Sequence, residues 1–172
     1  MSSTSIHVRI LTAADTEDFI RLRRLSLTTD PEAFCATPES DPALDPVHVR
    51  PRLEVPSLTG HGVVLGAYTG ELVGLLGLAP EERAGQQALR LWGYFVVPKM
   101  RGKGAGQALL ETAVALARKD PDIAWLDLEV RRGSRAAIAL YRSVGFEQIA
   151  SSRQQGSEDR LQFRLSLRPS SA

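Results

Sequence analysis

The feature that most constrains this chain of 172 residues is residues 91–110, where an apolar strand leads through Pro98 into a basic, glycine-rich turn and then a helix. The turn has a glycine at every second position, so its backbone can curve tightly and expose several N–H groups. The helix, expected from about residue 104 to residue 119, adds a partial positive charge at its N-terminus. The sequence therefore predicts a phosphate or diphosphate site made by Arg101, Gly102, Lys103, Gly104, Ala105 and Gly106.

Two other phosphate-binding loops fit this turn less well. A P-loop requires Ser or Thr after its lysine, whereas Gly104 follows Lys103, so the ligand for a magnesium nucleotide is missing. A dinucleotide-binding loop has the spacing Gly-x-Gly-x-x-Gly and follows the first strand, whereas this turn reads Gly-x-Gly-x-Gly and follows a strand near residue 97. Asp127 lies near the distance of an acidic ribose ligand, so the dinucleotide alternative stays open and ranks last.

Two blocks of the chain resemble the GNAT superfamily of N-acetyltransferases. Arg101-x-x-Gly104-x-Gly106, entered by Val96-Val97-Pro98, is similar to that family's acyl-CoA diphosphate motif. Residues 128–146, which end in Leu-Tyr-x-x-x-Gly-Phe, resemble its second strand-to-helix segment. The two blocks cover roughly residues 91–150. The resemblance implies an α/β (α+β) fold with a mixed, mostly antiparallel sheet flanked by helices, in a single domain over residues 1–172.

The resemblance also implies where an acyl donor binds. The donor would be acetyl-CoA, with its diphosphate on the glycine turn and its pantetheine arm along Val96 and Val97. Ser134 stands where the family usually carries an asparagine that contacts the cofactor, so this contact departs from the pattern. Four arginines nearby could help to hold phosphates or could simply be exposed: Arg131, Arg132, Arg135 and Arg142.

Tyr141 is the candidate proton donor for the departing thiolate. A phenol with a pKa of about 10 stays protonated at neutral pH and can protonate a thiolate whose acid has a pKa of about 8.5. Its position in the Leu-Tyr-x-x-x-Gly-Phe block carries this prediction, because the helix pattern alone would favour a tyrosine that only packs against the sheet.

Glu129 is the candidate base. In an extended strand, Leu126, Leu128 and Val130 would face one side and Glu129 would share the other with Asp127. Two like charges there would raise the pKa of at least one carboxyl group. In the branch of the family that acetylates ribosomal protein N-termini, a glutamate in a similar Leu-Glu-Val segment serves as base. The alternative is a solvated carboxylate.

Composition limits the partners and the setting. A formal net charge of +1 gives no electrostatic case for nucleic acid or an anionic membrane. No stretch reaches the ~18 apolar residues of a membrane span, and the N-terminus lacks a signal-like run, so a cytoplasmic protein is expected. The lone Cys35 excludes an intrachain disulfide. His7, His48 and His61 lie far apart, so no metal is predicted.

Periodicity and turn residues predict the remaining elements. A helix from about residue 12 to 30 should bury Phe19, Leu22 and Leu25. Residues 30–62 hold six of the ten prolines and are the least predictable; the resemblance implies that they form one wall of the acceptor site. The other expectations are strands at 6–11, 125–130 and 161–167, a hairpin of 63–68 with 72–78, a polar turn at 81–87, a helix at 134–144, and core positions for Trp92 and Trp125.

The predicted function is transfer of an acetyl group from acetyl-CoA to a primary amine by direct attack. The amine could belong to a small molecule, a protein N-terminus or a lysine, and the sequence does not choose among them. The alternative is an acyl-CoA-binding module without catalysis, which Ser134 favours and Tyr141 opposes. A homodimer is a further option, because dimers are common among proteins that resemble this one.

Overall fold

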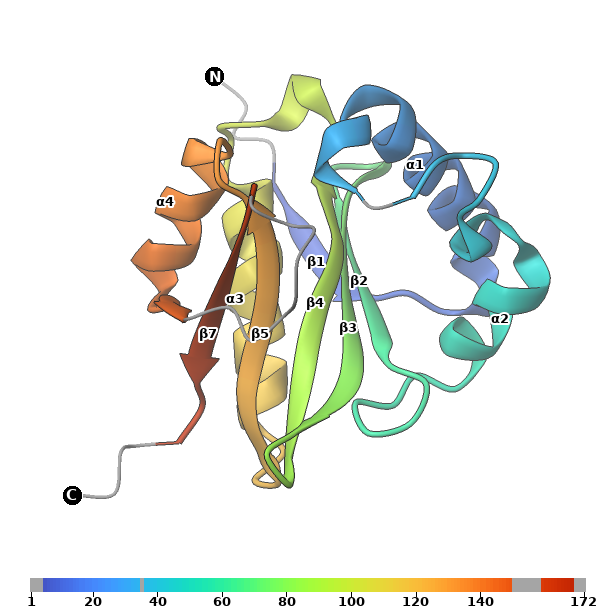
Figure 1. The fold of residues 1–172 in the computed structure, drawn as a ribbon. Helices are drawn as coiled ribbons and strands as arrows, with labels where there is room; N and C mark the ends of the chain where they lie inside the picture. The colour runs from blue at the N-terminus through green and yellow to red at the C-terminus, as the bar shows by residue number, and fades with distance from the viewer. Residues whose placement is uncertain (1–4, 35, 150–158, 169–172) are drawn as a thin grey trace.

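A mixed sheet forms the centre of the molecule (Figure 1). The computed structural model describes residues 5–34, 36–149 and 159–168, which excludes Cys35. Within them the strand order is β1-β2-β3-β4-β5-β7-β6, and β4 with β5 is the parallel pair. The fold class predicted from the sequence is therefore confirmed. The strands are β1 (His7–Ile10), β2 (Val63–Tyr68), β3 (Leu72–Arg83), β4 (Gln86–Val96), β5 (Ile123–Arg131), β6 (Glu147–Ile149) and β7 (Arg160–Ser166).

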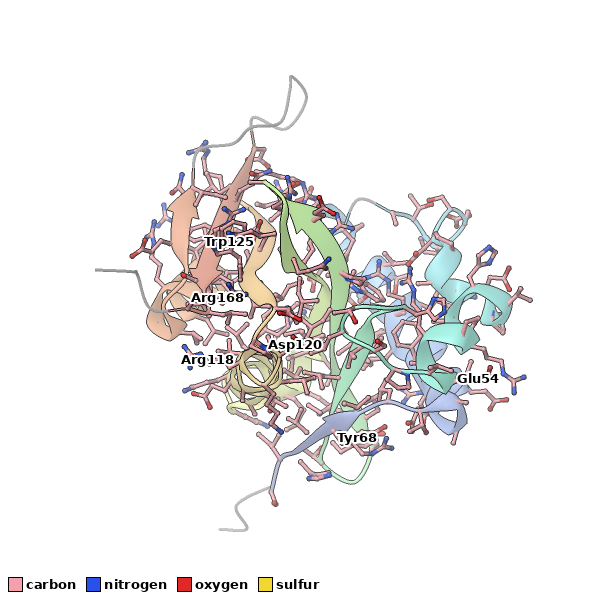
Figure 2. The ribbon with its side chains drawn as sticks, turned by 90° about the horizontal axis from the view of Figure 1, so that it is seen from below. Glu54, Tyr68, Arg118, Asp120, Trp125 and Arg168 are labelled. Atoms are coloured by element: carbon pink, nitrogen blue, oxygen red, sulfur yellow. The ribbon has the colours of Figure 1, made fainter. Side chains whose placement is uncertain are left out.

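Helices cover both faces of this sheet. They are α1 (Thr16–Thr29), α2 (Pro46–Glu54), α3 (Ala105–Arg118) and α4 (Arg135–Val144). The view from below in Figure 2 shows α3 end-on on one side of the strands and α1 with α2 on the other. Arg118 and Asp120, labelled there, mark the C-terminal end of α3. Its N-terminal end therefore lies at the top of Figure 1, where the glycine turn enters it.

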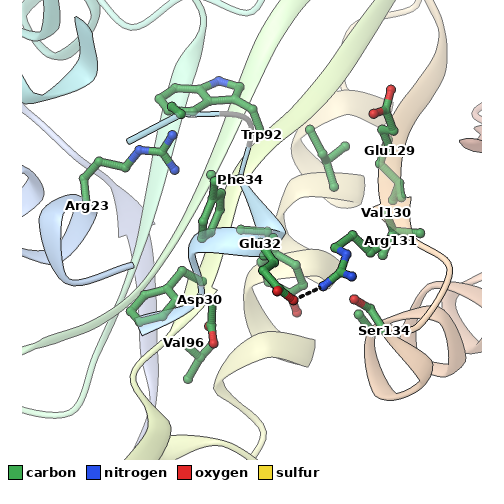
Figure 3. Close-up of a pocket in the computed structure, with 18 of the residues that line it drawn as sticks. Arg23, Asp30, Glu32, Phe34, Trp92, Val96, Glu129, Val130, Arg131 and Ser134 are labelled. Atoms are coloured by element: carbon green, nitrogen blue, oxygen red, sulfur yellow. Dashed lines mark hydrogen bonds and ion pairs between the residues drawn. The ribbon is translucent and has the colours of Figure 1, made fainter. Parts of the chain in front are cut away.

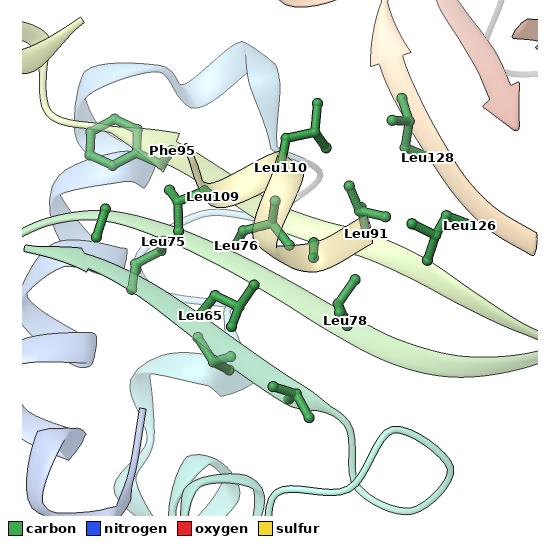
Figure 4. Close-up of a cluster of buried hydrophobic side chains, with 14 of the residues drawn as sticks. Leu65, Leu75, Leu76, Leu78, Leu91, Phe95, Leu109, Leu110, Leu126 and Leu128 are labelled. Atoms are coloured by element: carbon green, nitrogen blue, oxygen red, sulfur yellow. The ribbon is translucent and has the colours of Figure 1, made fainter. Parts of the chain in front are cut away.

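Leucines from the strands and from α3 make the core (Figure 4). Leu76, Leu109, Leu110 and Leu126 are fully inaccessible to solvent. Each such side chain contributes about 1.5–3 kcal/mol through burial. The apolar face of the helix after the glycine turn is thus buried against the sheet, and it fixes the N-terminus of α3 in space.

The apolar side of α1 differs from the prediction at one position. Phe19, Leu22 and Leu27 are buried, but Leu25 is 39% exposed. With 3.6 residues per turn, the buried side of this helix includes Arg23 instead of Leu25. An arginine thus takes a place in the interior that the sequence pattern had given to a leucine.

The hairpin of β3 and β4 is longer than predicted. The expected polar turn at residues 81–87 is mostly paired strand, with Glu82 opposite Gln87 and Arg83 opposite Gln86. The turn itself consists of Ala84 and Gly85, whose φ angles are +49° and +72°. Two positive φ angles are typical of the tight two-residue turns that continue the twist of a hairpin.

The proline-rich segment, residues 30–62, contains the helix α2, which begins at Asp45-Pro46, a pair that the sequence marks as a turn or a helix start. Asp45 caps α2 by accepting a hydrogen bond from the Val47 N–H at 2.9 Å, and Pro46 occupies the first turn. Pro51 lies inside the helix. The short strand β6 was not predicted. Across the residues that the structure describes, no helix is both long and apolar enough to cross a membrane.

Candidate active site

A cleft opens where β4 and β5 part. The two strands pair from Gln87 to Arg90 on β4, and the last pair is Arg90 with Asp127. Beyond it both strands continue without pairing to each other. The register of β4 with β3 also shifts between Leu75 and Gly77, and such a bulge bends the strand that carries it. The resulting cleft has a volume of about 1600 Å³ (Figure 3).

Residues from many parts of the chain line this cleft. Among them are Trp92, Tyr94 and Val96 of β4, Leu128, Glu129 and Val130 of β5, Arg101, Gly102 and Gly106 of the turn, Ser134, Arg135 and Tyr141 at and within α4, Asp30, Glu32 and Phe34 after α1, Arg23 of α1 and Arg52 of α2. The two sequence blocks that carried the resemblance therefore face one another across one cavity. The proline-rich segment, residues 30–62, forms one wall of this cleft.

The glycine turn presents a row of backbone donors. Gly102 and Gly104 have φ angles of +71° and +94°, in the left-handed region that glycine adopts without strain. From Gly102 to Gln107, no N–H donates to any residue in the described part of the chain. The first helical bond runs from the Ala108 N–H to the Gly104 carbonyl at 2.9 Å. Such donors at a helix N-terminus favour an anion.

Gly106 lets the Tyr94 side chain approach the backbone of α3 closely. A Cβ at this position would lie 2.6 Å from the Tyr94 hydroxyl oxygen, which is too close for any side chain. The Tyr94 ring is thereby held against the first turn of α3. Burial raises the pKa of Tyr94 above its ordinary value, so its hydroxyl stays protonated.

Val96 and Val97 occupy different environments. The Val97 N–H donates to the Val73 carbonyl at 2.9 Å, and its side chain is buried in the core. Bonded and non-bonded pairs alternate in antiparallel strands, so the N–H of Val96, opposite Gly74, points away from β3 and into the gap beside β5. Val96 lines the cleft, whereas Val97 does not; contact of either residue with a pantetheine arm stays a prediction.

Two ion pairs tie the segment after α1 across the cleft. Arg101 contacts Asp30, and Arg131 contacts Glu32, which Figure 3 marks with a dashed line. Arg101 also donates from Nε to the Val96 carbonyl at 2.9 Å. Arg131 has a second partner in Asp159 at 3.0 Å.

Tyr141 packs in an aromatic cluster and still reaches the cleft. Its ring centroid lies 5.9 Å from those of Tyr94 and Phe146 and 6.5 Å from that of Phe163. It is 6% exposed, and burial raises its pKa above the ordinary value. No described residue hydrogen-bonds to its hydroxyl. Packing therefore fixes the ring while the hydroxyl can donate to a ligand.

Glu129 lies on the opposite strand face from Leu126 and Leu128, as predicted. Its carboxylate is 29% exposed, lines the cleft, and has Arg160 Nε at 3.5 Å. Asp127 shares this face but is buried, and Arg164 binds it through two contacts of 2.7 Å. Each carboxylate thus has its own arginine, which offsets the mutual repulsion expected from the sequence.

Ser134 caps the N-terminus of α4. Its N–H donates to the Arg131 carbonyl at 3.0 Å, and its hydroxyl makes no capping hydrogen bond. Figure 3 shows this hydroxyl at the edge of the cleft. Of the other arginines considered, Arg135 lines the cleft, whereas Arg142 lies over the Phe163 ring at 5.7 Å.

Many cleft residues did not emerge from the sequence as site residues, and Arg23, Phe34 and Trp92 are among them. Arg23 stood among three arginines on a helix, Phe34 lay in the unpredictable segment, and Trp92 was expected in the core. Trp92 does pack against the core, yet it also lines the cleft. In the described ranges, no three His, Cys, Asp or Glu side chains are arranged to hold a metal ion.

Solved structures share this fold. The Salmonella typhimurium yncA structure with its cofactor acetyl-CoA is 22% identical, with a TM-score of 0.75 over 98% of this chain and 97% of that one. Arabidopsis thaliana NAA60 in complex with acetyl-CoA is 16% identical, with a TM-score of 0.67 over 94% of this chain and 99% of that one. At these identities the likeness concerns the fold.

Sequence comparisons identify the family. The Escherichia coli protein YjgM, an uncharacterized N-acetyltransferase, is 34% identical over 110 residues, which are 64% of this chain and 62% of YjgM. The N-alpha-acetyltransferase RimI of Mycobacterium tuberculosis is 36% identical over 90 residues, which are 52% of this chain and 54% of RimI. The match therefore spans less than two thirds of either relative. The profile of the acetyltransferase (GNAT) family matches residues 22–146, so the chain belongs to this family.

Proposed function

We propose that the chain binds acetyl-CoA in the cleft between β4 and β5 and transfers its acetyl group to a primary amine. The observation that carries this proposal is the row of backbone N–H groups from Gly102 to Gln107, which have no acceptor in the described residues. Gly102 and Gly106 of this row line the same cleft as Tyr141 and Glu129. A diphosphate on the turn would place the rest of the donor between the diverging strands. Family membership supports the same donor.

The turn supplies affinity through its backbone and not through side chains alone. Gly102, Lys103, Gly104, Ala105 and Gly106 would offer N–H groups to the phosphate oxygens, and the dipole of α3 would favour their charge. Lys103 is exposed beside the turn and adds a positive charge.

Arg101 would assist the diphosphate only after it leaves Asp30. In the structure its guanidinium is held by that carboxylate and by the Val96 carbonyl. Ser134 at the start of α4 has a hydroxyl that makes no capping hydrogen bond, and it would replace the asparagine contact of the family with a shorter hydrogen-bonding group.

The chemistry is acyl transfer by direct attack. The amine nitrogen forms a bond to the thioester carbonyl carbon, the carbon–sulfur bond breaks, and the thiolate takes a proton. Glu129 would accept a proton from the amine, directly or through water, and Tyr141 would give one to the sulfur. The Val96 N–H faces the gap and can hydrogen-bond the donor there.

The proposal is tested first by binding. Acetyl-CoA, NAD and ATP are compared by thermal shift and calorimetry, because a ligand bound by the native state raises stability by about 2.7 kcal/mol at a hundredfold excess over its Kd. Acetyl-CoA should bind, and NAD and ATP should not. Binding of NAD with no response to acetyl-CoA would refute the proposal.

The second test is turnover. Small amines, lysine-containing peptides and peptides with free N-termini are offered with acetyl-CoA, and released thiol is followed. Transfer to any of them supports an enzyme. Binding of acetyl-CoA without release of thiol in the presence of any acceptor would favour the non-catalytic module, the alternative that Ser134 favours.

A further inference from the structure

Arg23 is a buried arginine at the side of the cleft formed by β4. Its side chain is 8% exposed, and its Nε donates to Asp41 at 2.7 Å. Its Nη1 atom is also buried but has no hydrogen-bond partner in the described residues. A buried donor without an acceptor is costly. The ion pair with Asp41 therefore accounts for the burial of Nε, but it gives Nη1 no hydrogen-bond partner.

The guanidinium points toward the cleft between two aromatic rings, as Figure 3 shows. Its central carbon lies 4.8 Å from the centre of the Phe34 ring and 5.9 Å from that of Trp92. A Cβ placed on Gly93 would be 3.5 Å from Nη1, so this atom sits against the bulged part of β4. Phe34 follows a single 3-10 turn, and both Phe34 and Arg23 line the cleft.

The surroundings of Arg23 leave positive charge for a ligand. Asp41 balances Arg23 itself. Arg52 from α2 lies over Trp92 at 5.3 Å, and Arg90 lies on β4; both line the cleft, and neither is within an ion pair with a described residue. A planar carboxylate with a single charge matches an arginine fork in this setting. A doubly charged phosphate would meet Asp41 close by.

The position of Arg23 complements that of Glu129. Arg90 on β4 and Asp127 on β5 are the last paired residues of these strands. Trp92 and Glu129 each lie two residues further along their strands, so they face one another across the gap at the same height. Arg23 adjoins the β4 side at Trp92 and Gly93. Val96 lies three residues further along β4, about 10 Å away at 3.3 Å per residue. The guanidinium and the Glu129 carboxylate thus flank one end of the cleft.

We propose that Arg23 binds a carboxylate of the acceptor, and that the preferred acceptors are amines that also carry a carboxylate, as free amino acids do. The proposal rests on the acetyl transfer proposed above. The amine would face Glu129, the carboxylate would bind Arg23 Nη1, and Phe34 and Trp92 would contact the apolar part of the acceptor. Arg23 is then a specificity-determining residue.

The wild-type protein tests this first. The standard L-amino acids are offered with acetyl-CoA, each amino acid that reacts is compared with its carboxamide, and peptides with free N-termini serve as carboxylate-distant acceptors. Released thiol gives kcat and KM. A hydrogen bond to a charged group corresponds to roughly a 10- to 100-fold preference in kcat/KM for the free acid over the carboxamide.

Two variants locate the preference. Arg23→Gln/Asp41→Asn removes both buried charges together, so neither is left unpaired, and the asparagine keeps an oxygen for the Ala43 N–H that Asp41 binds at 3.0 Å. It should lose the preference mainly through a higher KM for the acid, with the carboxamide changed less than about threefold. Arg24→Gln, at the exposed neighbouring position, should keep it.

The outcomes separate this proposal from the one on which it rests. Transfer to carboxamides and peptides as efficiently as to acids, or a preference that survives in the double variant, would overturn the role of Arg23 and leave acetyl transfer intact. No transfer to any amine, with acetyl-CoA bound, would overturn both. If the double variant does not fold, the wild-type protein still tests the proposed substrate class. The ratio of its kcat/KM for the free acid to that for the carboxamide is then the deciding measurement.

Discussion

Replacing Tyr141 with phenylalanine removes one hydroxyl from the proposed active site and leaves the aromatic cluster in place. The ring packs against Tyr94, Phe146 and Phe163, and phenylalanine keeps these contacts. Because no described residue hydrogen-bonds to the hydroxyl, Tyr141→Phe should change the free energy of unfolding by less than about 0.5 kcal/mol. Affinity for acetyl-CoA should also change little.

Turnover should fall by about a hundredfold, the lower end of what a positioned general acid supplies. The lower end applies because burial raises the pKa of Tyr141 above the ordinary value of 10.0. The proton then moves from a weaker acid to a thiolate whose own acid has a pKa of about 8.5, which is uphill. A hundredfold loss corresponds to about 2.7 kcal/mol of transition-state stabilisation.

The assay follows thiol release with saturating acetyl-CoA, together with calorimetry for donor binding and thermal unfolding. Tyr68→Phe is the matched control, because Tyr68 lies outside the cleft and its hydroxyl is bonded to Arg9 at 2.9 Å and Asp15 at 3.1 Å. It should lose about 1–2 kcal/mol of stability and keep its turnover. Unchanged turnover in Tyr141→Phe, or a loss matched by weaker donor binding, would refute the proton-donor role.

Gly104→Val should weaken acetyl-CoA binding at least tenfold in calorimetry while the protein stays folded; the reason is the φ angle of +94° and not crowding, since a Cβ there would meet only Ile6 within 4 Å, at 3.8 Å. Glu129→Gln should lower turnover most near neutral pH, and higher pH should recover part of it because solvent then supplies free amine; a wild-type pH profile in this variant would place the base elsewhere. Asp127→Asn should instead lower stability, since it breaks the paired contacts with Arg164. The ion pair with Arg9 holds the pKa of Asp15 far below its ordinary value of 3.8. The stabilisation that the ionised Asp15 carboxylate gives is therefore fully present above about pH 4 and is lost as the pH falls. Asp15→Asn should lack this stabilisation, so its free energy of unfolding should depend less on pH in an acid titration.

The parts of the fold that follow local rules were predictable from the sequence. The glycine turn, the helix α3 that follows it and the helix α4 depend on residues close together in the chain, and the structure has each of them. The alternation that places Glu129 opposite Leu128 is equally local. The length of the β3–β4 hairpin was missed because polar residues on paired strands resemble a loop when only composition is read.

The acceptor side of the site could not be predicted because it depends on contacts between distant segments. Arg23 is buried only because Asp41, 18 residues later, neutralises it, and nothing in the helix pattern distinguishes it from Arg24. The position of the Val97 side chain also depends on a distant segment, because its N–H pairs with the Val73 carbonyl and the side chain is buried in the core. The bulge that opens the cleft is likewise a property of strand pairing.

The early end of pairing between β4 and β5 gives the sheet two edges in its interior. Backbone groups on those edges, such as the Val96 N–H, depend on water or a ligand for a hydrogen-bond partner. A long ligand bound in the gap, as proposed for acetyl-CoA, would act as a missing strand and would join two half-sheets that pair with each other only between residues 87–90 and 123–127. Occupancy of the cleft should accordingly slow hydrogen exchange not only at its walls but also in β7, which is anchored to the molecule through β5.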